Sequence, residues 1–336
     1  MKYIHVTSDG CHFPELIAEK VSRPGVYQWA RAFNTGKDTG EIRHINTIAP
    51  AELKNYDVVH ANLCGVSASI VPKLKQAIEG SDTKLIVNLD YAIEIVQEGF
   101  ERPREMWEAL MAADFVFVQE PFQQNFVSFF LKYHNPGKTQ KYQAALVPHP
   151  CDTAGLKGLQ VPNEDRLDML AVMIHRYREH IVVPAMLSWG VRSLTWGVGF
   201  TMGNIPIGLF GDASPMLEWE RYLYKLSHCT MALDYYLGVH SHSRFCEECA
   251  CLGIPTVSTE ESYMGKMLFP EISHNETDMQ GIRNDLEKLE AGFDEGSPSP
   301  FYLEVQEKSS QRIEDYNWEN SKKRLLEAMR TWEIKI

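Results

Sequence analysis

The side chains best suited to chemistry gather in one segment, residues 238–262 (GVHSHSRFCEECACLGIPTVSTEES). Its first part is a loop with imidazole and guanidinium groups at His240, His242 and Arg244. Such groups can bind sugar hydroxyls or phosphate oxygens, because they donate hydrogen bonds and can carry positive charge. The pattern predicts a ligand contact by at least one of the three, with a purely structural loop as the alternative.

The same segment contains the residue types that zinc prefers, at His242, Cys246, Cys249 and Cys251. On a helix, Cys249 and Cys251 point to nearly opposite sides and are poorly placed to share one ion. We therefore expect buried thiols that pack the helix, and no metal site. The chain has seven cysteines, an odd number spread along its length, which fits reduced thiols in a cytoplasmic protein.

These residues need elements that position them, and strand and helix patterns alternate along the whole chain. One example is the apolar run 57–63 (DVVHANL), which is followed by a helical pattern over 69–78. Such alternation predicts α/β domains with parallel sheets covered by helices. We also expect a strand at 44–48 (HINTI) and a polar, turn-rich linker at 155–165 (GLKGLQVPNED).

The length of 336 residues corresponds to about two domains. We place an N-terminal domain at 1–155, a second domain at 156–315 and a charged amphipathic helix at 316–336. Ligands in open α/β sheets lie at the carboxyl ends of the strands. Functional residues are therefore expected just after strands.

The chain carries 33 basic and 45 acidic residues, a formal net charge of −12. This charge repels nucleic acids and anionic lipids, so a nucleic-acid partner would require a local basic groove. No apolar run reaches the roughly 18 residues that indicate a membrane helix. We expect a protein of the cytoplasm without a transmembrane segment, and the sequence leaves its oligomeric state open.

Several segments, in the same order along the chain, resemble the retaining family-four glycosyltransferases of the GT-B fold. Residues 248–257 (ECACLGIPTV) resemble the family's donor-site signature, a Glu, a helix of small residues and Gly-x-Pro-Val. Residues 57–63 are similar to its Asp-Val-Val-His strand, and 147–152 (VPHPCD) to the end of its interdomain strand. Residues 206–233 and 315–329 (DYNWENSKKRLLEAM) are similar to its Gly-turn, helix and strand and to its Trp-containing last helix.

The resemblance implies two Rossmann-like domains that face a cleft, with the C-terminal helix returning to the first domain. It implies transfer of a sugar from a nucleoside diphosphate-sugar to an acceptor hydroxyl, with retention of anomeric configuration. The donor would bind the C-terminal domain and the acceptor the N-terminal domain, without a metal or another cofactor. The acceptor stays open between a glycan, a lipid-linked sugar, a protein and a modified DNA base, because acceptor loops vary while the fold stays fixed.

For the donor, the resemblance implies a phosphate contact at Arg176, after the first strand of the second domain, with Arg178 beside it. The alternative for both is a solvated surface charge. Glu248 would accept hydrogen bonds from ribose hydroxyls, or else only favour the start of its helix through the helix dipole. Glu247 is its substitute, because successive helix residues point about 100° apart and only one can face the cleft. Gly25 matches the family's glycine loop, where a missing Cβ lets backbone N–H groups approach phosphate or acceptor.

For catalysis, the resemblance implies Asp90, Arg176 and His240. Asp90 ends the strand KLIVNLD and would orient an acceptor hydroxyl or stabilise positive charge at the anomeric carbon. A helix N-cap is the alternative for Asp90. His60 and Glu120 occupy similar strand ends, where they could instead satisfy backbone donors.

The chain departs from the family at one position of the donor loop. The family has a second Glu eight positions before the one at Glu248, and this chain has His240 there. The loop 241–244 also lacks the family's Gly-Phe-Gly. Two alternatives to an ordinary transferase therefore stay open: a glycosyltransferase that modifies a hydroxymethylpyrimidine base in DNA, and an inactive module that only binds sugar nucleotides.

Overall fold

A computed structural model describes residues 1–7, 27–63, 68–90, 103–134, 143–174, 182–191, 194–199, 212–213, 219–291, 293 and 297–332. The chain divides into two compact units. Unit 1 comprises Met1–Asp152 and Asp315–Ile336, and unit 2 comprises Thr153–Glu314. The sequence predicted domain boundaries after residues 155 and 315, whereas the units are divided after Asp152 and Glu314.

Within its described residues, unit 1 contains a six-stranded parallel sheet in the order β2-β1-β3-β4-β5-β6. Its strands are β1 (Lys2–Thr7), β2 (Thr39–His44), β3 (Val58–Leu63), β4 (Lys84–Leu89), β5 (Phe115–Val118) and β6 (Ala145–Leu146). Strands β3, β4 and β5 are buried at nearly every position, as expected for a parallel sheet covered on both faces. Because all strands run the same way, the residues that follow them share one edge of the sheet.

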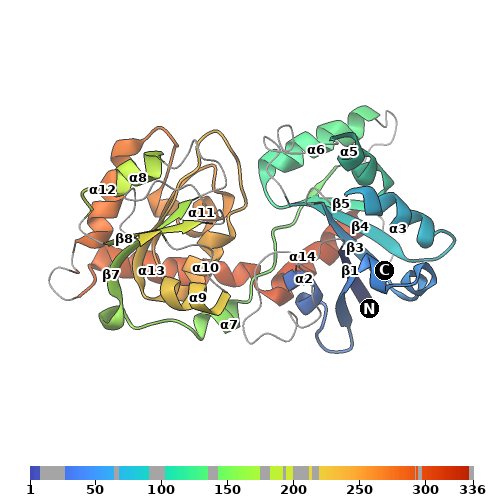
Figure 1. Ribbon diagram of the computed structural model, residues 1–336, viewed down its shortest axis with the longest axis horizontal. Helices are drawn as coiled ribbons and strands as arrows, with labels where there is room; N and C mark the ends of the chain where they lie inside the picture. The colour runs from blue at the N-terminus through green and yellow to red at the C-terminus, as the bar shows by residue number, and fades with distance from the viewer. Residues whose placement is uncertain are drawn as a thin grey trace. The chain divides into compact units, whose positions relative to one another are not determined.

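The helices in the described part of unit 1 are α2 (Tyr27–Ala32), α3 (Val71–Ala77), α5 (Pro103–Ala112), α6 (Pro121–His134) and α14 (Trp318–Thr331). Helix α14 comes from the far end of the sequence, and its Leu325 and Met329 are fully buried in the core of unit 1. Just beyond it, Trp332 packs edge-on against Phe115, with ring centroids 4.9 Å apart. Figure 1 shows α14, in red, beside α2. The return of the C-terminal helix to the first domain is therefore confirmed.

Unit 2 contains a second parallel sheet, in the order β12-β11-β10-β7-β8-β9 over its described residues. Its strands are β7 (Leu167–Ile174), β8 (Leu194–Gly199), β9 (Asp212–Ala213), β10 (Cys229–Asp234), β11 (Thr256–Thr259) and β12 (Ser273–His274). Strand β10 lies between β7 and β11, and all six of its residues are buried. The residues that follow β10 and β11 therefore emerge from the middle of the sheet, at its carboxyl edge.

The helices in the described part of unit 2 are α7 (Thr153–Lys157), α8 (Val182–Ser188), α9 (Trp219–Ser227), α10 (Arg244–Leu252), α11 (Tyr263–Leu268), α12 (Met279–Glu290) and α13 (Pro300–Arg312). Three of them begin at side chains that accept a hydrogen bond from a backbone N–H of the first turn, namely Ser262, Asp278 and Ser299. None of the helices described in either unit is both long enough and apolar enough to cross a membrane. The predicted class, an α/β chain with two parallel sheets, is confirmed.

The strand predicted at 44–48 is wrong. Strand β2 ends at His44, and Ile45–Thr47 forms a short 3₁₀ helix. The Asn46 N–H donates to the His44 imidazole at 3.2 Å, and the Thr47 hydroxyl donates to the His44 carbonyl at 2.7 Å. These local bonds replace the ladder that a strand would need, which is how short polar side chains commonly compete with regular structure.

The linker predicted at 155–165 starts too late and contains regular structure. Unit 1 gives way to unit 2 between Asp152 and Thr153, and α7 begins at once. Leu156 in this helix is buried, so the segment belongs to the core of unit 2. The turn-rich composition does mark the short 3₁₀ helix Asn163–Asp165, which leads into β7.

Candidate functional site

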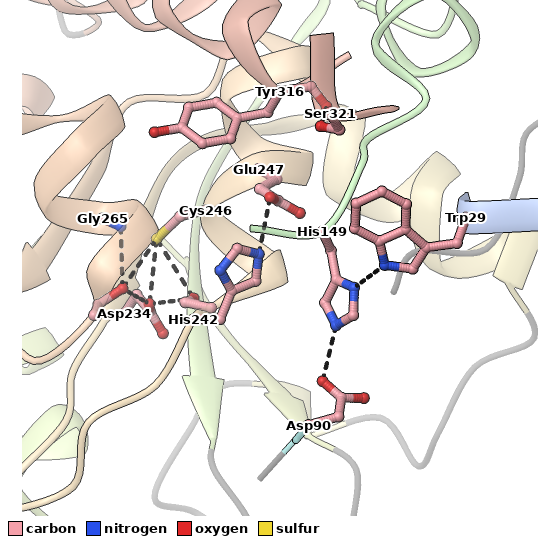
Figure 2. A network of polar contacts seen from close by, with 12 residues as sticks. Trp29, Asp90, His149, Asp234, His242, Cys246, Glu247, Gly265, Tyr316 and Ser321 are labelled. Atoms are coloured by element: carbon pink, nitrogen blue, oxygen red, sulfur yellow. Dashed lines mark hydrogen bonds and ion pairs between the residues drawn. The ribbon is translucent and has the colours of Figure 1, made fainter. Parts of the chain in front are cut away.

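Three side chains at the carboxyl edge of the unit 1 sheet form a chain of hydrogen bonds (Figure 2). The indole Nε1–H of Trp29, on α2, donates to Nδ1 of His149 at 3.1 Å. Nε2 of His149, which follows β6, lies 3.0 Å from Oδ1 of Asp90, which follows β4. His149 is fully buried, whereas the Asp90 side chain is 24% exposed. The sequence-predicted carboxylate thus lies at its strand end and is held there by a buried imidazole.

His60 lies in a second polar network, inside the sheet. Its Nε2 is 2.6 Å from Oδ1 of Asn88, and its Nδ1 is hydrogen-bonded to the Tyr3 hydroxyl. Burial lowers the pKa of His60 to about 3, so the imidazole is neutral at physiological pH. The neighbouring Asn62 donates to Oδ2 of Asp90 at 3.3 Å. His60 therefore bonds to side chains of the core. These bonds do not show it satisfying backbone donors, which was the alternative stated for it.

Glu120 has a structural role at the start of α6. Its two carboxylate oxygens accept the backbone N–H groups of Phe122 and Gln123, each at 2.6 Å. A carboxylate at this position satisfies donors that the first helical turn leaves without partners. The structural alternative stated for Glu120 therefore holds.

In unit 2, a buried carboxylate gathers three donors at the carboxyl edge of the sheet (Figure 2). Oδ2 of Asp234, the last residue of β10, accepts from the Ser243 hydroxyl at 2.5 Å and from the Ser262 hydroxyl at 2.7 Å. The Cys246 thiol also donates to it, at 3.2 Å. Asp234 is fully buried, so these donors replace the water that its charge has lost. The cluster ties the strand to the entrances of α10 and α11.

The loop that enters α10 has a constrained backbone. Ser243 immediately precedes the helix and has φ of 54°, the only left-handed residue other than glycine in the described part of the chain. Ser241 is held on both sides, by the carbonyl of Glu261 at 2.9 Å and by the N–H of Tyr263 at 2.8 Å. A left-handed non-glycine residue costs about 1 to 2 kcal/mol and persists only where its surroundings enforce it. The loop is therefore fixed by its contacts with the segment after β11.

Two adjacent carboxylates in the first turns of α10 are both buried and have different partners. Oε1 of Glu247 lies 3.0 Å from Nε2 of His242, which belongs to the entrance loop. Oε2 of Glu248 accepts a hydrogen bond from the Tyr222 hydroxyl on α9. Burial raises the pKa of Glu248 to about 7, against the lowering effect of Tyr222 and Arg244. Glu248 is therefore poised to change its protonation state near neutral pH.

The other end of α10 is fixed by backbone chemistry. Gly253 ends the helix with φ of 69°, and a Cβ there would approach the Gln306 side chain to 3.1 Å. Arg166 donates to the carbonyls of Leu252 at 2.8 Å and Gly253 at 2.7 Å, where the helix dipole favours a cation. The Gly-x-Pro part of the motif thus serves the helix end, so that the position of Glu248 is well defined.

The remaining predicted site residues fall into two groups. His240 is partly exposed in the loop between β10 and α10, and Arg244 is the first residue of α10. Gly25, Arg176 and Arg178 lie outside the described residues. Five of the predicted donor-site residues lie within the described residues. All five are in the loop before α10 or in its first two turns, namely His240, His242, Arg244, Glu247 and Glu248.

The thiols of α10 are buried and are not part of disulfide bonds, as expected for packing residues. Burial, and then the neighbouring Asp234, raise the pKa of Cys246 well above its ordinary value, so it is a neutral thiol. Within the described residues, no group of three or more His, Cys, Asp or Glu side chains is arranged to hold a metal ion.

Sequence reasoning did not single out Trp29, His149, Asp234 or Tyr222 as site residues. His149 and Asp234 carry a signal that could have found them, because each lies at or just after the end of a strand. Trp29 and Tyr222 carry none, since they lie on helices 120 and 26 residues from the groups they bond. Only the fold shows which distant side chain each of them meets.

No family model matches the chain, and no curated protein matches it in sequence. Solved structures match it over nearly its whole length. A trehalose-6-phosphate synthase has a TM-score of 0.67 at 8% identity, covering 98% of this chain and 99% of that one. The N-terminal domain of trehalose-6-phosphate phosphatase from Candida albicans has a TM-score of 0.66 at 9% identity, covering 98% and 97%.

A third structure is an alpha-glucosyltransferase in complex with UDP-glucose and DNA containing an abasic site. Its TM-score is 0.65 at 11% identity, covering 99% of each chain. Identities this low establish a common fold, and function has to be argued from the site. The chain therefore has the GT-B fold, with two parallel α/β units and a last helix that belongs to the first of them.

Proposed function

We propose that the protein is a retaining glycosyltransferase that moves a sugar from a nucleoside diphosphate-sugar to an acceptor hydroxyl. The observation that carries this proposal is the buried Glu248 in the first turns of α10, with a pKa near 7, at the carboxyl edge of a parallel sheet. A buried carboxylate at a ligand-binding edge is costly unless something donates hydrogen bonds to it, and ribose hydroxyls are such donors. The likeness in fold to a trehalose-6-phosphate synthase and to an alpha-glucosyltransferase supports the same class of reaction.

In this proposal the donor binds unit 2. Glu248 accepts from the ribose hydroxyls while Tyr222 holds one of its oxygens, and Glu247 keeps His242 in place. The loop residues His240 and Arg244 supply donors and positive charge for the sugar and the diphosphate. Arg176 and Arg178 take up the phosphates, with Arg176 the more important. A neighbour that binds UDP-glucose supports a UDP-sugar as the first donor to test.

The acceptor binds unit 1, where Asp90 meets the hydroxyl that is to be glycosylated. The bond between the anomeric carbon and the diphosphate oxygen breaks, and the acceptor oxygen bonds to the same face of that carbon. The hydroxyl proton passes to an oxygen of the departing diphosphate, so atoms and charge balance. Negative charge grows on the diphosphate during this step and is stabilised by Arg176 and His240, without a metal or another cofactor. Gly25 lets backbone N–H groups approach the phosphate or the acceptor.

The test is the release of nucleoside diphosphate from a panel of sugar nucleotides, with and without acceptors. We expect release from a UDP-sugar and weaker UDP binding by Glu248→Gln, by about 1 to 3 kcal/mol, because a charged hydrogen bond in a buried site is lost. Glu220→Gln is the matched control, since Glu220 is an exposed carboxylate on α9, the helix that carries Tyr222.

Other outcomes would change the assignment. Binding of sugar nucleotides without release, whatever the acceptor, would make the protein a binding module. Release only with DNA that carries hydroxymethylated bases would make it a DNA glycosyltransferase, against which the net charge of −12 counts. Failure to bind any sugar nucleotide would refute the proposal.

A further inference from the structure

The hydrogen bonds of His149 fix which of its ring nitrogens carries a proton. An indole Nε1–H can only donate, so Nδ1 of His149, 3.1 Å from the Trp29 nitrogen, must accept and has no proton. The carboxylate of Asp90 can only accept when it is charged, so Nε2 of His149, 3.0 Å away, must donate. The two contacts agree on one state, the neutral ring with its proton on Nε2.

The same geometry opposes a second proton on the ring. A proton on Nδ1 would point at the indole N–H, which would lose its acceptor and face another donor. His149 is fully buried, and burial disfavours a charged imidazole. Among the described groups nearby, Asp90 favours the charged ring and is itself partly screened by solvent, while His60 is neutral and adds no positive charge. Burial and the indole N–H both oppose a second proton on the His149 ring, and we infer that together they exceed the attraction of the Asp90 carboxylate for that proton.

We propose that His149 is a positioning residue, locked by Trp29 as the neutral Nε2–H tautomer, that aims the Asp90 carboxylate without neutralising it. The role of Asp90 toward an acceptor rests on the proposed function, whereas the locked state of His149 does not. A positively charged histidine would tie the carboxylate up in an ion pair. A neutral donor fixes its direction and leaves its negative charge for the acceptor hydroxyl or for the positive charge of the reacting sugar.

The direct test is nitrogen-15 NMR of the imidazole rings in the full chain, with His149→Gln used to assign the signal. We expect the neutral Nε2–H pattern for His149, unchanged from about pH 5 to pH 8, a range in which an ordinary histidine titrates. In Trp29→Phe the ring loses the donor that blocks Nδ1, so His149 should titrate within that range. Trp318→Phe is the matched control, because the Trp318 indole donates to Gln28, which is also on helix α2, and its bond does not involve His149.

Three results would overturn the proposal: an Nδ1–H tautomer, a charged ring at neutral pH, or titration of His149 in the unaltered protein. An unchanged His149 in folded Trp29→Phe would show that the indole is not the lock. Trp29 is fully buried, so that variant can fail to fold. In that case the test uses the unaltered protein. We expect a scalar coupling across the hydrogen bond between the Trp29 indole and His149, and the absence of this coupling would contradict the proposal.

Kinetics test the positioning role once a donor and acceptor are known. His149→Leu should lower kcat about tenfold to a hundredfold with unchanged UDP affinity, because a misdirected Asp90 affects the reacting geometry and not the donor site. His149→Gln keeps an amide donor and should recover much of kcat. Equal loss in both variants, or loss of UDP affinity, would make His149 merely structural. If no donor is ever turned over, the proposed function fails while the NMR result still stands by itself.

Discussion

The carboxyl edges of the two sheets hold their carboxylates in different ways. In unit 1, Asp90 remains partly exposed and is directed by the neutral donor His149. In unit 2, Asp234, Glu247 and Glu248 are all buried and depend on hydroxyl, thiol and imidazole partners. One edge thus keeps a hydrated charge, whereas the other has exchanged water for protein donors.

This difference separates two electrostatic situations. A charge in contact with water is inexpensive to maintain and varies little with its surroundings. A buried charge is costly, so its protonation and its stability respond to every donor that is added or removed. Unit 2 is therefore the place where a hydroxyl-rich ligand can change the protein most, whereas unit 1 presents a carboxylate that stays in contact with water.

The largest effect should come from removing the most buried carboxylate. Asp234→Ala leaves the donors on Ser243, Ser262 and Cys246 without their acceptor, and we expect unit 2 to lose about 3 to 5 kcal/mol of stability. Asp90→Ala should cost unit 1 less, about 1 to 3 kcal/mol, because the two donors it leaves, on His149 and Asn62, lie at a site that is partly open to water. Hydrogen exchange of the β10 and β4 amides measures the two losses separately. Similar losses would remove the contrast between the edges.

The next effect concerns Glu248 and has a definite dependence on pH. Its pKa is raised from 4.5 to about 7, so between these values the folded protein holds a proton that the unfolded chain has released. Stability from this group is therefore greatest below about pH 4.5 and falls as the pH rises to about 7. Glu248→Gln should match the unaltered protein at pH 4 and be more stable by up to about 3 kcal/mol at pH 8. Urea unfolding at both pH values tests this, and a destabilised variant at pH 8 would contradict it.

The same carboxylate should make UDP binding depend on pH. The charged form accepts ribose hydroxyls better than the neutral form, so affinity should rise about tenfold as the pH increases through about 7. The phosphates of UDP titrate as well, and Glu248→Gln serves as the control because only the ligand then contributes. Calorimetry at several pH values compares the two proteins. Parallel pH profiles would show that Glu248 does not meet the ribose.

The smallest effect concerns the backbone of the entrance loop. Ser243→Ala and Ser243→Gly both lose the hydroxyl that bonds to Asp234, but only glycine adopts a φ of 54° without strain. The glycine variant should therefore be more stable than the alanine variant by about 1 kcal/mol. Thermal unfolding of the two variants measures the difference. An alanine variant of equal or greater stability would mean that the loop is not strained.

Much of the fold was predictable because continuous apolar runs mark buried parallel strands. Strands β3, β4, β5 and β10 fall where those runs lie, and α10 falls where its small-residue pattern lies. The errors came where local polar bonds decide the outcome, as at His44–Thr47, and where amphipathic helices are surrounded by turn residues. For this reason helices α12 and α13 were not predicted from the sequence. Their N-cap residues, Asp278 and Ser299, are nevertheless of types that commonly mark the start of a helix.

The candidate site was predictable only in part. Position after a strand identified Asp90, and a family-like motif identified Glu248, each from nearby sequence. The prediction that only one of Glu247 and Glu248 can face the cleft did not anticipate that both carboxylates would be buried with separate partners. Partners such as Trp29 for His149 depend on tertiary contacts over 120 residues, which spacing alone does not encode.

The position of α14 has a consequence for how the protein is made. A ribosome adds the whole of unit 2 before it reaches Leu325 and Met329, which complete the core of unit 1. Until α14 has been made, unit 1 lacks part of its core, and the apolar surface beside Phe115 stays uncovered. The first half of the chain is thus translated first but cannot finish folding until the last helix has been synthesised, and chaperone demand during expression should be greatest before that point.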